Sequence, residues 1–123
     1  LLRFHLQIPS GPGEDLLAYM ATIFVDAMRD CFKTGGYSEK ENEVETITSS
    51  ILVGIDGRLF EFDVDFQVQE IIGYSAIGSG GQVALGSLYA TERRNPVYRI
   101  QNALEAAEKF NAGVRGPFQI LKA

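Results

Sequence analysis

The sequence has 123 residues, of which 46% are hydrophobic and 22% are charged, and its formal net charge is -5 at pH 7. This length and composition predict one compact domain over residues 1–123, and no apolar run is long enough to cross a bilayer. The acidic balance also argues against nucleic acid as a partner, because binding to phosphates requires clustered Lys and Arg.

Cysteine and histidine each occur once, which limits disulfide and metal chemistry. Cys31 has no cysteine to pair with, and it lies on the apolar side of a helical pattern, where cysteine usually serves as a small core residue. His5 lacks the companion ligands that a metal site of familiar spacing needs. We therefore expect no metal and no cofactor, and a cytoplasmic location.

The first part of the chain predicts a helix followed by an acidic loop. Residues 1–6 form an apolar stretch with neither an initiator methionine nor a signal-peptide pattern, which indicates that the beginning of the domain is missing. Apolar residues then recur at helical spacing over residues 16–32, and Gly35 and Gly36 end the pattern. Residues 37–45 are strongly acidic, and we interpret them as a solvated loop in preference to a cation or partner site.

From residue 48 the pattern changes to β-strand. Residues 50–55 and 58–69 flank the pair Asp56-Gly57, which supplies the positive φ angles of a tight hairpin turn. Apolar and polar residues alternate in the second arm, so one face is buried. Asp63 and Asp65 lie on the polar face, where a solvated or interface surface fits them better than a pair of catalytic carboxylates. A further apolar segment spans residues 71–77.

The remaining residues predict two helices and a short final strand at 117–121. Residues 82–93 form a helix rich in small residues, and Asn95 and Pro96 are start signals for the next helix. Because the strands are grouped and do not alternate with helices, the α+β class is favoured over a doubly wound sheet. The inner face of the last helix is predicted to contain Val97, Ile100, Leu104, Ala107 and Phe110.

Glycine and a single hydroxyl are concentrated before the first of these two helices, at Gly78, Ser79, Gly80 and Gly81. Amides at a helix start attract anions, but the sequence has Val83 where a dinucleotide fingerprint needs glycine, and it lacks the Walker lysine. A serine nucleophile elbow would need glycine at Ile77 and a base, for which His5 is the only histidine. The pattern itself favours glycines that permit close strand–helix packing, with Ser79 capping the helix.

Taken together, these segments resemble a known family. The Asp56-Gly57 hairpin, the Ala-Ile-Gly-Ser-Gly-Gly turn at 76–81, the Ala84-Leu85 pair and the Ala-Leu-Glu-Ala-Ala run at 103–107 are similar to the second half of proteasome-type N-terminal-nucleophile (Ntn) hydrolases. The resemblance covers residues 48–112 and is fainter over 16–33. It is strongest to the peptidase subunit of the bacterial two-component ATP-dependent protease and to standalone proteasome-like proteins of actinobacteria and their phages.

The resemblance implies a four-layer αββα sandwich that here lacks its first strands. It also implies a homo-oligomer acting on a peptide or protein substrate through a threonine freed at the chain's N-terminus, whose own α-amine is the base. The family's serine at the Ser79 position lies beside that amine and helps to orient proton transfer. Ser79 is thus expected to be a catalytic helper, and the wall of the oxyanion and substrate cleft to be formed by Gly78, Gly80 and Gly81.

The sequence departs from the family pattern in two respects. The strands that carry the family's threonine, aspartate and lysine precede the first helix, and every threonine of this chain is internal. The family also places an aspartate just after the last long helix, where this chain has Lys109, Phe110 and Asn111. Three hypotheses follow: a threonine-type peptidase whose nucleophile lies upstream of Leu1, a catalytically inactive scaffold subunit, and an unrelated anion-binding module.

Overall fold

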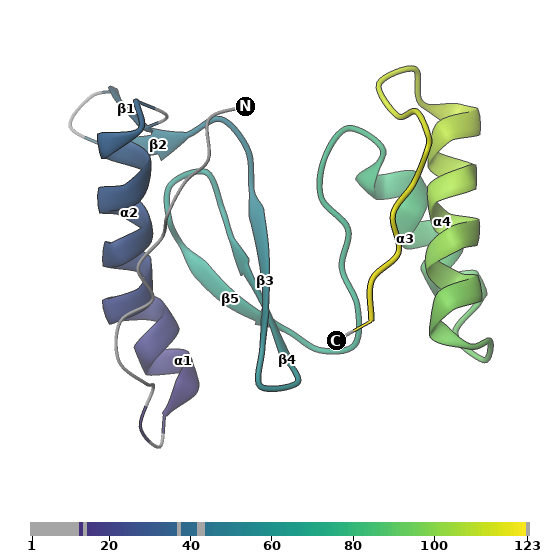
Figure 1. Cartoon of the computed structure of the whole chain (residues 1–123), viewed down its shortest axis with the longest axis horizontal. Coiled ribbons are helices and arrows are strands. Elements are labelled where there is room, and N and C mark those ends of the chain that lie inside the picture. Colours follow the sequence, from purple (N-terminus) through teal and green to yellow (C-terminus); the bar gives the residue numbers. More distant parts are fainter. Residues whose placement is uncertain (1–12, 14, 37, 42–43, 123) are drawn as a thin grey trace. The chain divides into compact units, whose positions relative to one another are not determined.

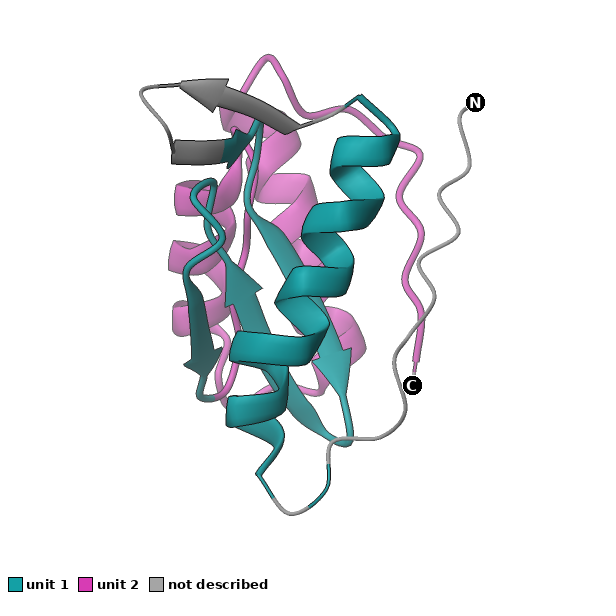
Figure 2. Ribbon diagram, turned by 90° about the vertical axis from the view of Figure 1, so that its left-hand side faces the viewer, with its two compact units in different colours: residues 1–72 teal, residues 73–123 magenta. Residues whose placement is uncertain are grey.

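The computed structural model describes residues 13, 15–36, 38–41 and 44–122, and Figure 1 shows their helices and strands. The chain divides into two compact units, residues 1–72 and 73–123, which Figure 2 colours separately. A three-stranded antiparallel sheet together with helices confirms the α+β class. The layer order and the single domain over residues 1–123 stay predictions, and His5 lies outside the described residues.

Unit 1 begins with one helical segment that contains a π-helical turn. It consists of α1 (Leu16–Tyr19), η1 (Met20–Phe24) and α2 (Val25–Thr34). The Asp15 carboxylate accepts a hydrogen bond of 3.0 Å from a backbone amide of the first turn, and Gly36 ends the helix at φ 75°. The predicted helix is confirmed, although a spacing of 3.6 residues does not anticipate its π turn.

Two short strands overlap the segment that the sequence predicts to be a loop, residues 37–45. β1 (Ser38–Glu41) pairs antiparallel with β2 (Val44–Ile47), so the loop prediction is wrong for these residues. A run of charges indicates that side chains are solvated, but ladder hydrogen bonds are made by the backbone. Ile47 anchors this hairpin, because it is buried and its N–H donates to the carbonyl of Val64 at 2.8 Å.

The sheet of unit 1 has the strand order β3-β4-β5. β3 (Ile51–Ile55) and β4 (Arg58–Phe62) are joined by Asp56 and Gly57, whose φ angles of 50° and 73° are those of a tight hairpin turn. This hairpin was predicted and is confirmed. β5 (Val68–Ile71) pairs antiparallel with β4 on its other side.

The second arm of the hairpin ends at Phe62 and does not continue to Gln69. The N–H of Asp63 donates to the carbonyl of Gln67 at 2.9 Å, and between them Phe66 has φ 64°. Phe66 is nevertheless only 4% exposed. The apolar–polar alternation therefore runs through the turn without a break, which is why strand periodicity does not detect it.

Asp63 and Asp65 stabilise this turn. Asp63 Oδ1 accepts hydrogen bonds from the N–H of Val64 at 2.7 Å and from the Ser50 hydroxyl at 3.3 Å. The Asp65 carboxylate accepts from both the backbone and the side-chain amide of Gln67. The two aspartates thus have local structural roles, as expected of Asx-type turns.

The core of unit 1 lies between the helical segment and one face of the sheet. Phe60 and Phe62 of β4 are completely buried, and the Phe62 ring centroid is 5.8 Å from that of Phe24. Cys31, in contrast to the prediction of a core position, is only half-buried. The buried cluster consists of Leu16, Tyr19, Met20, Phe24, Val25, Met28, Ile47, Phe60, Phe62 and Phe66.

Unit 2 contains α3 (Gly81–Ala90) and α4 (Pro96–Phe110), which pack against each other. Asn95 caps α4 as predicted, since its side-chain oxygen accepts from the N–H of Tyr98 at 2.9 Å. The guanidinium of Arg99 donates to the carbonyl of Leu88 at 2.9 Å and so links the two helices.

The buried face of α4 agrees with the predicted one at Ala107 but not at Ile100 and Phe110. Ala103 and Ala107 are each 3% exposed, whereas Phe110 is 71% exposed and Ile100 is 40% exposed. Small side chains thus allow α3 to approach α4 closely, and the larger apolar residues lie beside this contact.

The apolar segment at residues 71–77 contributes only Ile71, the last residue of β5, to the sheet, and the predicted strand at 117–121 does not pair with a described strand. No helix in the described ranges combines the length and the hydropathy that a membrane span requires.

Replacing the α4 cap tests the assignment of the helix start. We expect Asn95→Ala to lower the free energy of unfolding by about 1 kcal/mol, because an N-terminal amide loses its acceptor. Urea unfolding measures this loss. The control Gln101→Ala removes an exposed side chain that bonds only to Glu105 in the same helix, and a loss equal to that of Asn95→Ala would contradict the cap.

The ion pair between β4 and β5 predicts a pH dependence. The Arg58 guanidinium donates two hydrogen bonds to Glu70, and this holds the pKa of that carboxyl below its ordinary value of 4.5. The resulting stability is present above that value and is lost as the pH falls through the lowered pKa. Urea unfolding midpoints should therefore be measured from pH 7 to pH 3. At neutral pH the midpoint of Glu70→Gln should lie below that of the wild type, and in acid the two midpoints should converge. A gap that stays constant with pH, or that also appears for Glu105→Gln, would contradict the pairing.

Candidate functional site

The glycine turn leads directly into α3. Gly78 has φ 92°, a conformation that favours glycine, and its carbonyl accepts a hydrogen bond of 3.0 Å from the N–H of Gly81. Gly80 occupies the N-cap position, and no side chain caps the helix. The prediction that Ser79 caps α3 is therefore wrong, because Ser79 lies one residue too early; its side chain is exposed.

Two of these glycines permit close packing, although the segment before the turn is not the strand that the sequence predicts. A Cβ placed on Gly80 would lie 2.6 Å from Val114 Cγ2 and 3.0 Å from Ala107 Cβ. A Cβ on Gly81 would lie 3.0 Å from the carbonyl oxygen of Ala76. The turn thus packs on two sides. Gly80 meets α4 and the chain that follows it, and Gly81 meets the segment that precedes the turn.

Asn111, immediately after α4, binds the turn through its side chain. Its Nδ2 donates to the carbonyl oxygen of Ser79 at 2.7 Å, and its Oδ1 accepts from the N–H of Gly113 at 2.8 Å. In the sequence, Asn111 stands out only as a departure from the family pattern. An Asn-x-Gly sequence after a helix is a signal for such a turn, but the contact with Ser79, 32 positions earlier, has no local signal.

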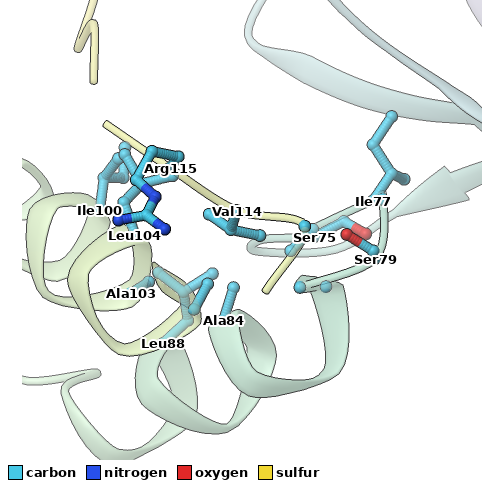
Figure 3. A pocket seen from close by; sticks show the side chains of 16 residues that line it. Ser75, Ile77, Ser79, Ala84, Leu88, Ile100, Ala103, Leu104, Val114 and Arg115 are labelled. Atoms are coloured by element: carbon cyan, nitrogen blue, oxygen red, sulfur yellow. The ribbon is translucent and has the colours of Figure 1, made fainter. Parts of the chain in front are cut away.

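A cavity of about 570 Å³ lies beside this turn, within unit 2. Figure 3 shows Ser75, Ile77 and Ser79 on one side of it and Ile100, Leu104 and Arg115 on the other. The predicted site residues Gly78, Ser79, Gly80 and Gly81 all line this cavity. Its floor includes the small and apolar side chains of Ala84, Leu88, Ala103, Ala107 and Val114.

The chemistry available in this cavity is limited. Arg115 is the only titratable side chain among the described residues that line it. A serine hydroxyl becomes nucleophilic only beside a proton acceptor, and the lining offers none. Ser79 can therefore orient or relay a proton but is not activated as a nucleophile by these residues.

Other ligand chemistries find little support in the same turn. The N–H of Gly81 already donates to the carbonyl of Gly78. An anion at the start of α3 would therefore find one free amide fewer than the glycine-rich sequence indicates. Within the ranges that the structure describes, no three His, Cys, Asp or Glu side chains gather where a metal ion could bind.

One titratable group near the α3–α4 contact is perturbed. Partial burial of Tyr74, together with the hydrogen bond that its hydroxyl donates to Glu92 at 2.9 Å, raises the pKa of this phenol. The Arg99 guanidinium also lies over its ring, 4.7 Å from the centroid. Tyr74 thus stays protonated at neutral pH and is not a base.

Comparisons with known proteins give a structural match. No protein-family model and no curated protein matches the sequence. The structure of BPH from Thiobacillus denitrificans matches with a TM-score of 0.68 and 24% identity, over 89% of this chain and 60% of that chain. BPH in complex with epoxomicin matches with a TM-score of 0.65 and 22% identity, over the same shares. The chain therefore shares the fold of about three fifths of BPH.

The fit of Gly80 against its neighbours can be tested by two matched substitutions. We expect Gly80→Ala to destabilise the protein by about 1–3 kcal/mol, because the added methyl group overlaps Val114 and Ala107. Gly86→Ala, within α3, meets no atom within 4 Å and should stabilise it by about 0.5–1 kcal/mol. Urea unfolding of both variants measures the difference. Equal effects of the two substitutions would show that Gly80 is not packed in this way.

Proposed function

We propose that this sequence is the C-terminal part of a proteasome-like, threonine-type Ntn hydrolase that cleaves peptide amide bonds. The observation that carries the proposal is the structural match to BPH, which has also been solved with epoxomicin, a proteasome inhibitor. The Gly-Ser-Gly-Gly turn at the family's position, ahead of α3, supports it. The proposal includes the four-layer αββα sandwich, completed by strands that precede Leu1.

In this proposal the nucleophile is a threonine at the N-terminus of the mature chain, and its own amine is the base. Ser79 lies beside that amine. A hydroxyl suits this place because it can accept a hydrogen bond from a protonated amine and donate one to a neutral amine. The Ser79 hydroxyl is exposed and makes no hydrogen bond to a described residue, so it is available for this contact.

The remaining parts of the site follow from the same placement. The glycines at 78, 80 and 81 line the cavity; Gly78 is exposed and offers its backbone to a peptide, whereas Gly80 and Gly81 are buried and let the turn pack closely behind it. We further propose a homo-oligomer. Two large apolar side chains of unit 2 support assembly, because Tyr89 is 73% exposed and Phe110 is 71% exposed.

The alternative proposal is a catalytically inactive subunit that keeps the fold as a scaffold. Asn111, which stands near the position of the family's aspartate, favours it. None of the described residues that line the cavity is a base. This is compatible with both proposals, since the family's base is the amine of the threonine itself.

Epoxomicin separates the two proposals. We expect the full-length protein, including any segment that precedes Leu1, to form a covalent adduct that intact mass spectrometry detects and peptide mapping places on the N-terminal threonine. Ser79→Ala should slow adduct formation by about a hundredfold, as loss of a proton-transfer partner does. Ser75→Ala, in the same cavity wall, is the matched control and should react at nearly the wild-type rate. A folded wild-type protein without an adduct would favour the scaffold.

A further inference from the structure

Each of the four polar groups of Asn111 makes a hydrogen bond, and one of these bonds joins the end of α4 to the glycine turn. Its backbone N–H donates to the carbonyl of Ala107 at 2.9 Å, and its backbone carbonyl accepts from the N–H of Val114 at 3.1 Å. These two bonds fix the main chain of Asn111. Its side chain is thereby held with the Nδ2 amide on Ser79 and the Oδ1 oxygen on Gly113.

The bond to Ser79 has a required direction. A backbone carbonyl can only accept a hydrogen bond, so its partner must carry an N–H or O–H group. A carboxylate of the same shape would place a second acceptor, and a negative charge, against the carbonyl oxygen at 2.7 Å. Asparagine and aspartate are therefore not equivalent at this position, although they have nearly the same size.

A steric contact restricts the same serine from the other side. A Cβ on Gly113 would lie 2.8 Å from Ser79 Oγ and 3.1 Å from Asn111 Oδ1. The hydroxyl of Ser79 thus occupies space that only a glycine at 113 leaves open. The backbone of Ser79 is held by a hydrogen bond, and a side chain at residue 113 would displace the hydroxyl from its present position.

We propose that Asn111 is a positioning residue for Ser79, and that this role requires the side-chain amide. The inference rests on the proposed function, in which the Ser79 hydroxyl meets the amine of the nucleophile. An aspartate at 111, the residue type that the family resemblance leads one to expect, would repel the turn in this chain. The amide of Asn111 is then a working part of the site and not a sign of inactivity.

The first test uses full-length protein labelled with ¹⁵N-glycine. In Asn111→Asp the amide signals of Gly80 and Gly81 should shift at pH 7, and should return toward the wild-type positions near pH 4, where the introduced carboxyl is partly protonated and can donate again. Residues 73–90 carry no charged side chain, and the wild type measured over the same pH range is the control for glycine signals that move for other reasons. Unshifted glycine signals at pH 7 would overturn the inference.

The second test measures the rate of reaction with epoxomicin below the unfolding transition. Asn111→Asp should displace the Ser79 hydroxyl and so lower the rate of reaction with epoxomicin by about tenfold to a hundredfold. Gly113→Ala, which crowds Ser79 without changing the amide, should be slowed as well. The matched control is Asn102→Asp on α4. Asn102 donates to the Ser87 hydroxyl at 2.8 Å, and this hydroxyl can donate to a carboxylate instead. The control should therefore react at nearly the wild-type rate.

The outcomes separate this inference from the proposed function. If the wild type does not react, the proposed function fails, and the glycine signals still test the contact of Asn111 with the turn. If the wild type reacts and Asn111→Asp reacts at the same rate, the proposed function stands and the positioning role is overturned. A purely structural role would lower the unfolding midpoint without changing the rate of the folded protein.

Discussion

Gly80 lies against Ala107 and Val114 at a distance that leaves no room for a methyl group. The rest of unit 2 depends on this contact. It brings the start of α3 onto the C-terminal part of α4, and the small face formed by Ala103 and Ala107 makes the approach possible. The chain that follows α4 then returns over the turn, where Asn111 bonds to Ser79. One close approach thus determines the helix contact, the cavity and the position of the exposed hydroxyl.

The cavity beside this contact is well formed but chemically incomplete. Its described lining provides shape, backbone and a hydroxyl, while a proton acceptor for that hydroxyl is lacking. A site of this kind suits a helper better than a nucleophile, and the proposed N-terminal threonine brings nucleophile and base on one residue.

Local signals in the sequence were reliable where a single short segment determines its own conformation. Asp56 and Gly57 form the predicted hairpin turn, and Asn95 caps the predicted helix. The turn over residues 63–67 was missed because its apolar and polar residues alternate as in a strand. Phe66 is buried although it lies in the turn.

The candidate site was predictable only in part, for the same reason. The glycine turn stands out in the sequence, whereas the contact of Asn111 with Ser79 joins residues that are far apart in the chain. The buried face of α4 was assigned correctly at Ala107 but wrongly at Phe110, because size favoured Phe110, while the close approach of α3 selects Ala103. Packing between distant segments decides such positions, and periodicity within one segment does not contain that information.

The position of Ser79, just ahead of the first turn of α3, has an electrostatic consequence. The aligned peptide dipoles of a helix place roughly half a positive elementary charge at its N-terminus. An ammonium group beside Ser79 would face that partial charge, and neither the turn nor α3 carries a formal charge to offset it. The helix would thus favour the neutral amine over its protonated form, and only the neutral amine can take a proton from a hydroxyl.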